Sequence, residues 1–133
     1  MSISVKHEMK KGYLHFEVTG DFALEEACRT FSEALQVVDR LAAAKVLVDC
    51  LGLRGAPTVM EHYRYGEFIA AELMRQSEKR KKNPQLAYVA RTPLRDRADL
   101  SVTVAGNRGV FIKSFDTIEE GLAWLGVKPG GPQ

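Results

Sequence analysis

The stretch KVLVDCLGLRGAPTVMEHYRYGEFI, Lys45 to Ile69, decides the fold. Its apolar run Val46–Val48 ends at Asp49, and an uninterrupted run of this kind predicts a strand that is covered on both faces. A glycine-bearing loop follows, and Pro57 and Thr58 then open a helix. In α/β proteins, binding sites form where such a strand, loop and helix start meet, because backbone donors converge there. The stretch therefore predicts a central strand and the place of the functional site.

Two strands and a helix are expected before this stretch. Residues 3–9 and 13–18 have the alternating pattern of two short antiparallel strands, which lie on either side of Lys11-Gly12. From Ala23 to Ala43, apolar residues recur at helical spacing, which predicts an amphipathic helix. Asp21 is expected to help cap the start of this helix.

A second helix is expected directly after the glycine-bearing loop, from about Thr58 to Gln76. Its core stripe is expected to contain Val59, Tyr63, Gly66, Ile69, Ala70 and Leu73. The helix ends in the basic run SEKRKKNP, residues 77–84. This run is short, lacks interleaved aromatic residues and is stopped by Pro84, which favours a solvated connector over a nucleic-acid or membrane contact.

The remaining chain predicts two more strands, each followed by a helix. The strands are expected at residues 86–90 and 109–115, with a helix between them that begins after Pro93. The last helix has a D-x-x-E start that spans residues 116–119 and a stop at Gly126.

The order of elements is therefore β-β-α-β-α-β-α-β-α, which indicates the α/β class. This order implies a mixed sheet with helices packed on it, whose later strands are parallel and joined by right-handed crossovers. The length of 133 residues suits one domain. We expect a single domain at residues 1–127 and a flexible C-terminal tail at residues 128–133.

Composition excludes several classes of function. With 19 basic and 17 acidic residues, the net charge of +2 is too balanced to predict a nucleic-acid partner. No apolar run approaches the ~18 residues of a membrane span, and no signal peptide is recognised. Cys28 and Cys50 have no metal-binding spacing, and no phosphate-binding glycine motif occurs. The sequence thus predicts a cytoplasmic protein without a cofactor or a metal site.

Four short motifs resemble one known family. They are V-D at 48–49, E-x-Y-x-x-G-E at 61–67, A-x-N-R-G at 105–109 and F-D-T-I-E-E-G-L-A-W-L at 115–125. Together with the order of elements, they are similar to the STAS or SpoIIAA-like family of anti-sigma-factor antagonists, and more closely to a group of uncharacterised bacterial SpoIIAA-like proteins. The resemblance spans nearly the whole chain.

The resemblance implies a non-enzymatic domain that binds a partner at the loop between the central strand and the next helix. In the antagonists, a serine at this helix start is phosphorylated, which switches partner binding. Pro57 and Thr58 stand where the family has an Asp-Ser pair, so this chain departs from the family at the switch itself. The fold is also related to the lipid-binding CRAL-TRIO domains, which implies a small apolar or lipid-like ligand as an alternative.

Thr58 has two interpretations. The sequence T-V-M-E forms a capping box, in which Thr58 and Glu61 satisfy each other's backbone amides. The second interpretation is phosphorylation of Thr58, since a phosphate there would face the helix amides and Arg54. Capping is the simpler of the two.

Three other candidate positions are weighed against structural roles. Cys50 and His62 suggest a nucleophile and a base, but three histidines in the whole chain make a complete catalytic constellation hard to assemble. Asp49 is expected to hold the following loop through backbone amides. Tyr65 and Phe68 lie off the core stripe, so a dimer partner, an apolar ligand or the neighbouring loop is expected to cover them.

The sequence therefore predicts a regulatory or protein-interaction module, with no catalytic residue and with a homodimeric state. Its binding surface is expected to consist of Arg54, Gly55, Thr58, His62 and Tyr65. The alternative is a carrier of a small apolar ligand between the second helix and the sheet.

Overall fold

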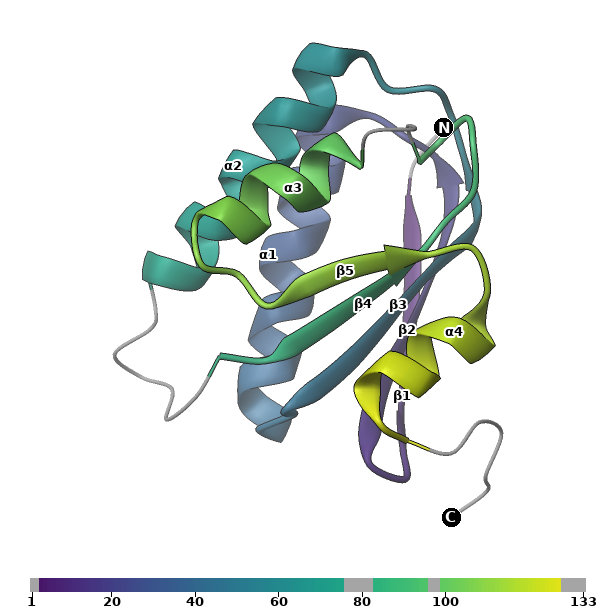
Figure 1. The fold of residues 1–133 in the computed structure, drawn as a ribbon, viewed down its shortest axis with the longest axis vertical. Coiled ribbons are helices and arrows are strands. Elements are labelled where there is room, and N and C mark those ends of the chain that lie inside the picture. Colours follow the sequence, from purple (N-terminus) through teal and green to yellow (C-terminus); the bar gives the residue numbers. More distant parts are fainter. Residues whose placement is uncertain (1–2, 76–82, 96–98, 128–133) are drawn as a thin grey trace.

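The computed structural model describes residues 3–75, 83–95 and 99–127, and the element order predicted from the sequence is confirmed (Figure 1). The elements are β1 (Ser4–Lys10), β2 (Tyr13–Asp21), α1 (Leu24–Leu41), β3 (Lys45–Arg54), α2 (Val59–Arg75), β4 (Gln85–Val89), α3 (Leu100–Asn107), β5 (Ile112–Phe115) and α4 (Ile118–Leu125). Most of the basic run after α2 and the predicted tail at 128–133 lie outside the described residues.

The strands form one five-stranded mixed sheet in the order β1-β2-β3-β4-β5. β1 is antiparallel to β2, whereas the pairs β2–β3, β3–β4 and β4–β5 are parallel. This confirms the expected mixed sheet with parallel later strands. It also places β3 at the centre, with its carboxyl end leading to α2.

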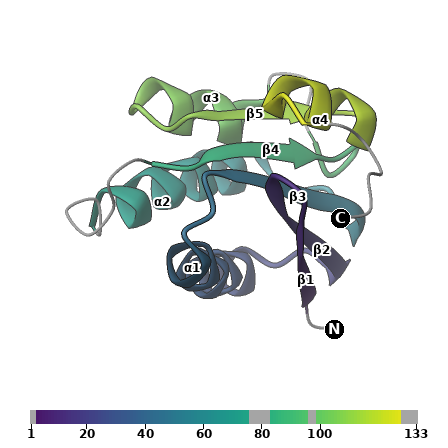
Figure 2. The ribbon, with the colours of Figure 1, turned by 90° about the horizontal axis from the view of Figure 1, so that it is seen from below.

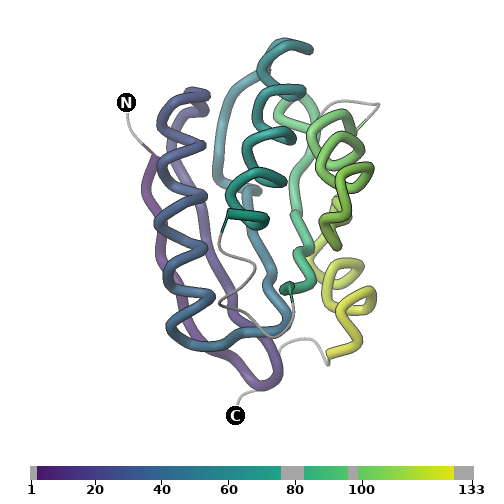
Figure 3. The backbone as a smooth tube through the Cα atoms, turned by 90° about the vertical axis from the view of Figure 1, so that its left-hand side faces the viewer, coloured from purple at the N-terminus to yellow at the C-terminus, as the bar shows by residue number. Residues whose placement is uncertain are grey.

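Helices cover both faces of the sheet. Figure 2 shows α4 on the opposite side of the sheet from α1 and α2, and in Figure 3 α1, α2 and α3 lie side by side. The core on the α4 side contains Tyr13, Leu47, Ala87, Val89, Leu122 and Leu125. The core on the other side includes Leu14, Phe16, Phe31, Leu35, Val46, Ile69, Leu86 and Ala105. Alternate residues of β3 and β4 enter the two cores, as the period of a strand requires.

The central strand is longer than the sequence predicts. The prediction ended it at Asp49, but β3 continues to Arg54 because β2 accompanies it through a register shift between Glu17 and Thr19. At Gly52, an added Cβ would lie 2.8 Å from Cγ2 of Thr19. The glycine therefore permits the two strands to approach each other, and does not mark a loop.

The residues that cap or begin three of the helices differ from the prediction. At α1 the capping position is Ala23, which makes no side-chain cap, while Asp21 pairs with Arg54 instead. At α4 the cap is Thr117, whose hydroxyl accepts a hydrogen bond from the Glu120 amide at 3.1 Å.

The third difference is the start of α3, which begins at Leu100 and not directly after Pro93. Before it, the Arg95 amide donates to the Arg91 carbonyl in a turn, and Asp99 has a left-handed backbone with φ of 49°. Arg95 binds Asp99 and the distant Asp116 through its side chain, which stabilises this turn before the helix.

Within the described ranges, no helix combines the length and the apolar character needed to cross a membrane.

Candidate functional site

The start of α2 carries the capping box that the sequence predicts. The Glu61 amide donates to Oγ1 of Thr58 at 3.1 Å, and the Thr58 amide donates to Oε1 of Glu61 at 2.8 Å. Two of the amides that a helix start leaves without partners are thereby satisfied. Thr58 nevertheless stays exposed, at the end of the loop that follows the carboxyl end of β3.

Arg54 and Gly55 fix the path of the chain from β3 to α2. Nε of Arg54 donates to Oδ1 of Asp21 at 2.9 Å, and the Arg54 carbonyl accepts from the Phe22 amide at 2.7 Å. Gly55 has φ of 140°, and an added Cβ would lie 2.9 Å from Cβ of Phe22. Only glycine fits this turn without strain, and the two bonds of Arg54 tie the start of the loop to the end of β2.

Large apolar side chains are exposed around this loop and helix start. Val59 is 73% exposed and Met60 57%, while Leu51 and Tyr63 are 40% and 39% exposed. The expected core stripe of α2 is therefore wrong at Val59 and Tyr63. We define Leu51, Arg54, Thr58, Val59, Met60 and Tyr63 as the rim.

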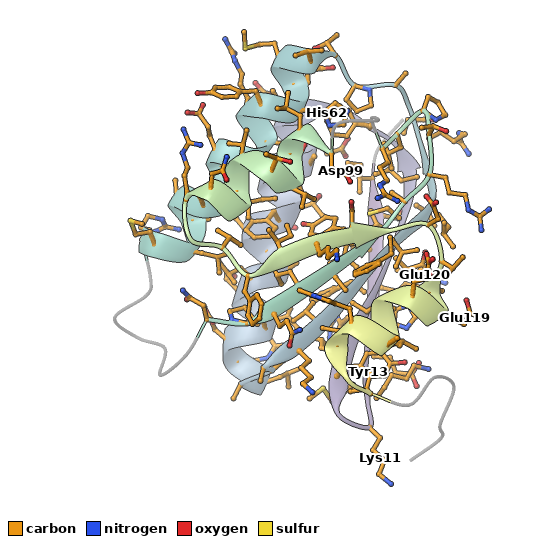
Figure 4. All side chains as sticks on the ribbon, in the orientation of Figure 1. Lys11, Tyr13, His62, Asp99, Glu119 and Glu120 are labelled. Atoms are coloured by element: carbon orange, nitrogen blue, oxygen red, sulfur yellow. The ribbon has the colours of Figure 1, made fainter. Side chains whose placement is uncertain are left out.

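His62 points inward, unlike the rim. It lies on α2 on the side of α3 (Figure 4), and only 8% of it is exposed. Nδ1 lies 3.0 Å from Oγ of Ser101, at the start of α3. The Ser101 hydroxyl donates to the His62 carbonyl at 2.9 Å, so it accepts from Nδ1–H. The other nitrogen, Nε2, is buried without a hydrogen-bond partner among the described residues.

Tyr65 also points inward, and its hydroxyl oxygen lies 3.1 Å from that of Tyr88 on β4. Burial raises the pKa of Tyr65, although the hydrogen bond from Tyr88 opposes this shift. Burial and the neighbouring Tyr65 raise the pKa of Tyr88 as well. Both side chains therefore remain neutral phenols at physiological pH.

A cavity of about 140 Å³ lies between the sheet and the helices α1, α2 and α3. His62, Tyr65 and Tyr88 line it, and most of the remaining wall is apolar, with residues such as Phe16, Leu35, Val48 and Leu86. Val48 and Tyr88 keep some accessible surface although they lie on central strands, because they face this cavity. Pro57, next to Thr58, is also part of the wall, so the cavity reaches the loop that carries the rim.

An ion-pair network closes one part of the cavity wall. Arg95 contacts Asp99 through Nε at 2.7 Å and Nη2 at 3.0 Å, and Ser114 donates to Asp99 at 2.8 Å. Burial alone would raise the pKa of Asp99, but these hydrogen bonds hold it below its ordinary value. Asp99 is therefore charged and fully engaged. The network thus joins β5, α3 and the turn after β4.

The geometry does not support Cys50 as a nucleophile. Burial, followed by the charge of Asp49, raises the pKa of Cys50 from its ordinary value of 9.0 to about 12. Since the thiolate is the reactive form, this thiol is inert at neutral pH. Asp49 itself accepts from the Leu51 amide at 3.0 Å, which is the expected structural role.

Tyr65 and Phe68 are covered within the chain. Both rings make edge-on contacts with Phe31 of α1, at centroid distances of 6.4 Å. The covering element is thus a helix of the same chain and not the neighbouring loop. This packing offers no support for the predicted dimer contact at these two residues.

The structure divides the predicted binding surface into two parts. Arg54, Gly55 and Thr58 lie together at the exposed loop, whereas His62 and Tyr65 line the interior cavity. In the part of the chain that the structure describes, no group of three His, Cys, Asp or Glu residues is arranged to hold a metal ion.

Several site residues were missed by the sequence analysis. Tyr88 sits in the otherwise apolar strand LAYVA, and its phenol was the available signal. Met60 is apolar and off the predicted stripe, which could have indicated an exposed apolar position. The contact of Ser101 with His62 had no local signal, because 39 residues separate them.

Comparison with solved structures identifies the fold. The structure is similar to the crystal structure of an anti-sigma factor antagonist from Mycobacterium paratuberculosis, with a TM-score of 0.60 and 18% identity over 93% of this chain and 94% of that chain. It is also similar to an uncharacterised protein of the DUF3478 family with a SpoIIAA-like fold from Shewanella loihica, with a TM-score of 0.52 and 17% identity over the same shares of the two chains. No protein-family model and no curated protein matches the sequence. The expected SpoIIAA-like fold is thereby confirmed.

Proposed function

We propose that this chain, which has the SpoIIAA-like fold, is a non-catalytic regulatory module that binds a partner protein through its rim. The observation that carries the proposal is the exposure of Val59 and Met60 beside the exposed loop at Arg54 and Gly55. Exposed apolar side chains that are clustered next to polar ones are typical of protein interaction sites. The similar fold of an anti-sigma factor antagonist supports the same type of role.

A photo-crosslinking residue in the native cells tests this proposal. We expect a discrete protein adduct when the crosslinker replaces Met60, and none when it replaces Glu119, which is exposed on α4 on the other side of the sheet (Figure 4). The variant Met60→Asp should reduce copurification of the same adduct protein at least tenfold. Equal adducts from both positions, or from neither, would contradict the proposal.

Thr58 is proposed as the point of regulation. A phosphoryl group there would add about two negative charges beside the Glu61 carboxylate that completes the cap. The phosphate would displace Glu61 and would be stabilised by the amides at the start of α2. Phosphopeptide mapping of protein from native cells tests this, and a Thr58 peptide that never carries phosphate would remove the idea.

The chain is further proposed to form a homodimer. All but the last residue of the edge strand β1 are exposed, so a second copy can pair with this strand. Sedimentation at micromolar concentration should give the mass of a dimer. A monomeric mass across the concentration range would exclude it.

A second candidate function, the carriage of a small apolar ligand, is supported by the cavity between α2 and the sheet. An apolar cavity of ~150 Å³ is large enough to take up a molecule such as benzene. Native mass spectrometry of protein that is purified gently from its own cells should detect a retained organic molecule. Protein whose mass equals that of the bare chain in every preparation would count against carriage.

A further inference from the structure

The cavity wall has unused hydrogen-bonding capacity at two tyrosines. Two phenols carry two hydroxyl hydrogens, and the bond between Tyr65 and Tyr88 uses one of them. The remaining hydroxyl hydrogen has no acceptor among the described residues. A polar hydrogen without an acceptor in an apolar interior is unfavourable, so the wall is incomplete without a bound acceptor.

His62 provides a second observation, which concerns an acceptor instead of a donor, because Nδ1 carries the ring hydrogen. It precedes Tyr65 by one turn of α2, lines the same cavity and leaves Nε2 buried without a partner among the described residues. Its ring is held by Ser101, so it cannot turn to find one without losing that bond. One donor and one acceptor of the same wall thus lack partners, and an oxygen acceptor on a ligand would pair with the tyrosine donor and not with Nε2.

The rest of the wall determines the polarity, charge and size of a molecule that could bind in the cavity. It is largely apolar, and the charged residues of the wall, Arg95 and Asp99, are paired with each other. A charged ligand would therefore have no counter-ion, and burial of its charge would be costly. The volume of about 140 Å³ limits the body to roughly one six-membered ring.

We infer that the cavity binds a small, uncharged, ring-sized apolar molecule that carries one oxygen acceptor, and that the hydroxyl pair of Tyr65 and Tyr88 holds this oxygen. The inference rests on the second candidate function, ligand carriage, and adds the ligand class and the anchoring residues. It is independent of partner binding at the rim.

Two probes of nearly equal shape test the anchor. Cyclohexanone carries a carbonyl oxygen where methylenecyclohexane carries a CH₂ group, so the probes differ mainly in the acceptor. Their dissociation constants are measured by NMR titration at pH 8 with the wild type and with Tyr65→Phe/Tyr88→Phe. This double variant replaces both hydrogen-bonding partners by groups of the same shape, which costs little stability.

The double variant should lower the affinity for cyclohexanone about three- to tenfold and leave that for methylenecyclohexane unchanged or higher. The matched control Tyr13→Phe, in the core on the α4 side of the sheet and outside the cavity lining, should change neither. In the wild type, the carbonyl stretching band of bound cyclohexanone should lie below its position in a hydrocarbon solvent, which is a readout that needs no variant.

The outcomes separate the two hypotheses. If both probes bind, and neither the double variant nor the carbonyl band distinguishes them, the anchor is wrong while ligand carriage stands. If neither probe binds saturably to the wild type, both the anchor and carriage in this cavity are wrong. If the double variant fails to fold, an unshifted carbonyl band in the wild type still overturns the anchor.

Discussion

The two faces of the sheet are packed differently. On the α4 face, Leu47, Ala87 and Val89 are fully buried, and an added Cβ at Gly121 would lie 2.9 Å from Cδ1 of Leu47. On the face covered by α1, α2 and α3, a cavity of about 140 Å³ remains. We call the α4 side the dense face and the side with the cavity the hollow face. The residues that line a void lack dispersion contacts, so packing stabilises the hollow face less than the dense face. The comparison places the candidate ligand site, as distinct from the rim, on the face that contains the cavity.

The largest expected effect is the difference between two leucine truncations. Leu122→Ala on α4 should lower the free energy of unfolding by about 3–5 kcal/mol, because Leu122 is 1% exposed in dense packing. Leu35→Ala on α1 should cost about 2–3 kcal/mol, since Leu35 already borders the cavity. Urea unfolding of both variants measures this. Equal losses would show that the two faces do not differ in packing.

The next effect is a change in stability that should be opposite in sign for alanine-to-valine substitutions at two positions near each other in the chain, Ala87 and Ala90. Ala87→Val, on the dense face, should destabilise the protein by about 1–3 kcal/mol through overpacking. Ala90→Val adds the same atoms to the cavity wall and should stabilise it by up to about 1 kcal/mol. Thermal unfolding compares the two, and a loss at Ala90 as large as that at Ala87 would contradict the cavity.

The pKa of Cys50, which lines the cavity, indicates whether water reaches this face of the sheet. Because its pKa is raised from 9.0 to about 12 in the folded protein, the unfolded state releases this proton first. Stability from this group is therefore complete below pH 9 and is lost as the pH rises towards 12, by about 1 kcal/mol per pH unit. Urea unfolding between pH 9 and 10 should show this slope in the wild type and a smaller slope in Cys50→Ala. Identical slopes would mean that the thiol is solvated.

The smallest change in stability is expected at the rim, where the contacts of Thr58 are made within one helix turn. Thr58→Ala should cost about 1 kcal/mol, because the Glu61 amide loses its acceptor. Thr58→Ser keeps the hydroxyl and should remain within a few tenths of a kcal/mol of the wild type. Urea unfolding distinguishes them. A full loss in the serine variant would show that more than the cap depends on this side chain.

Periodicity predicted which helices and strands form, but it predicted the residues at which they begin and end less well. The apolar period of α1 and the uninterrupted run of Val46–Val48 each reflect one local environment, so both elements were recognised. The capping box at Thr58 was also predicted, because its partner Glu61 lies only three residues away. In contrast, Gly52 was taken for a loop residue, since its reason is the close approach of Thr19 on another strand.

The candidate site was predicted only in part for the same reason. Arg54, Gly55 and Thr58 are neighbours in sequence, and their common exposure follows from one loop. Whether Val59 or His62 faces the core depends on the rotation of α2 against α3. That rotation is fixed at Gly66, where an added Cβ would lie 2.9 Å from Cβ of Val104.

The sequence by itself determined the order of elements, the buried central strand and the cap of α2, because each is recorded in a pattern of residues within a few positions of one another. Only the tertiary structure decided that Tyr65 and His62 turn inward, that Tyr65 meets Tyr88, and that a cavity lies on one face of the sheet. These features arise from contacts between segments that are far apart in the chain, and local patterns carry no record of such contacts.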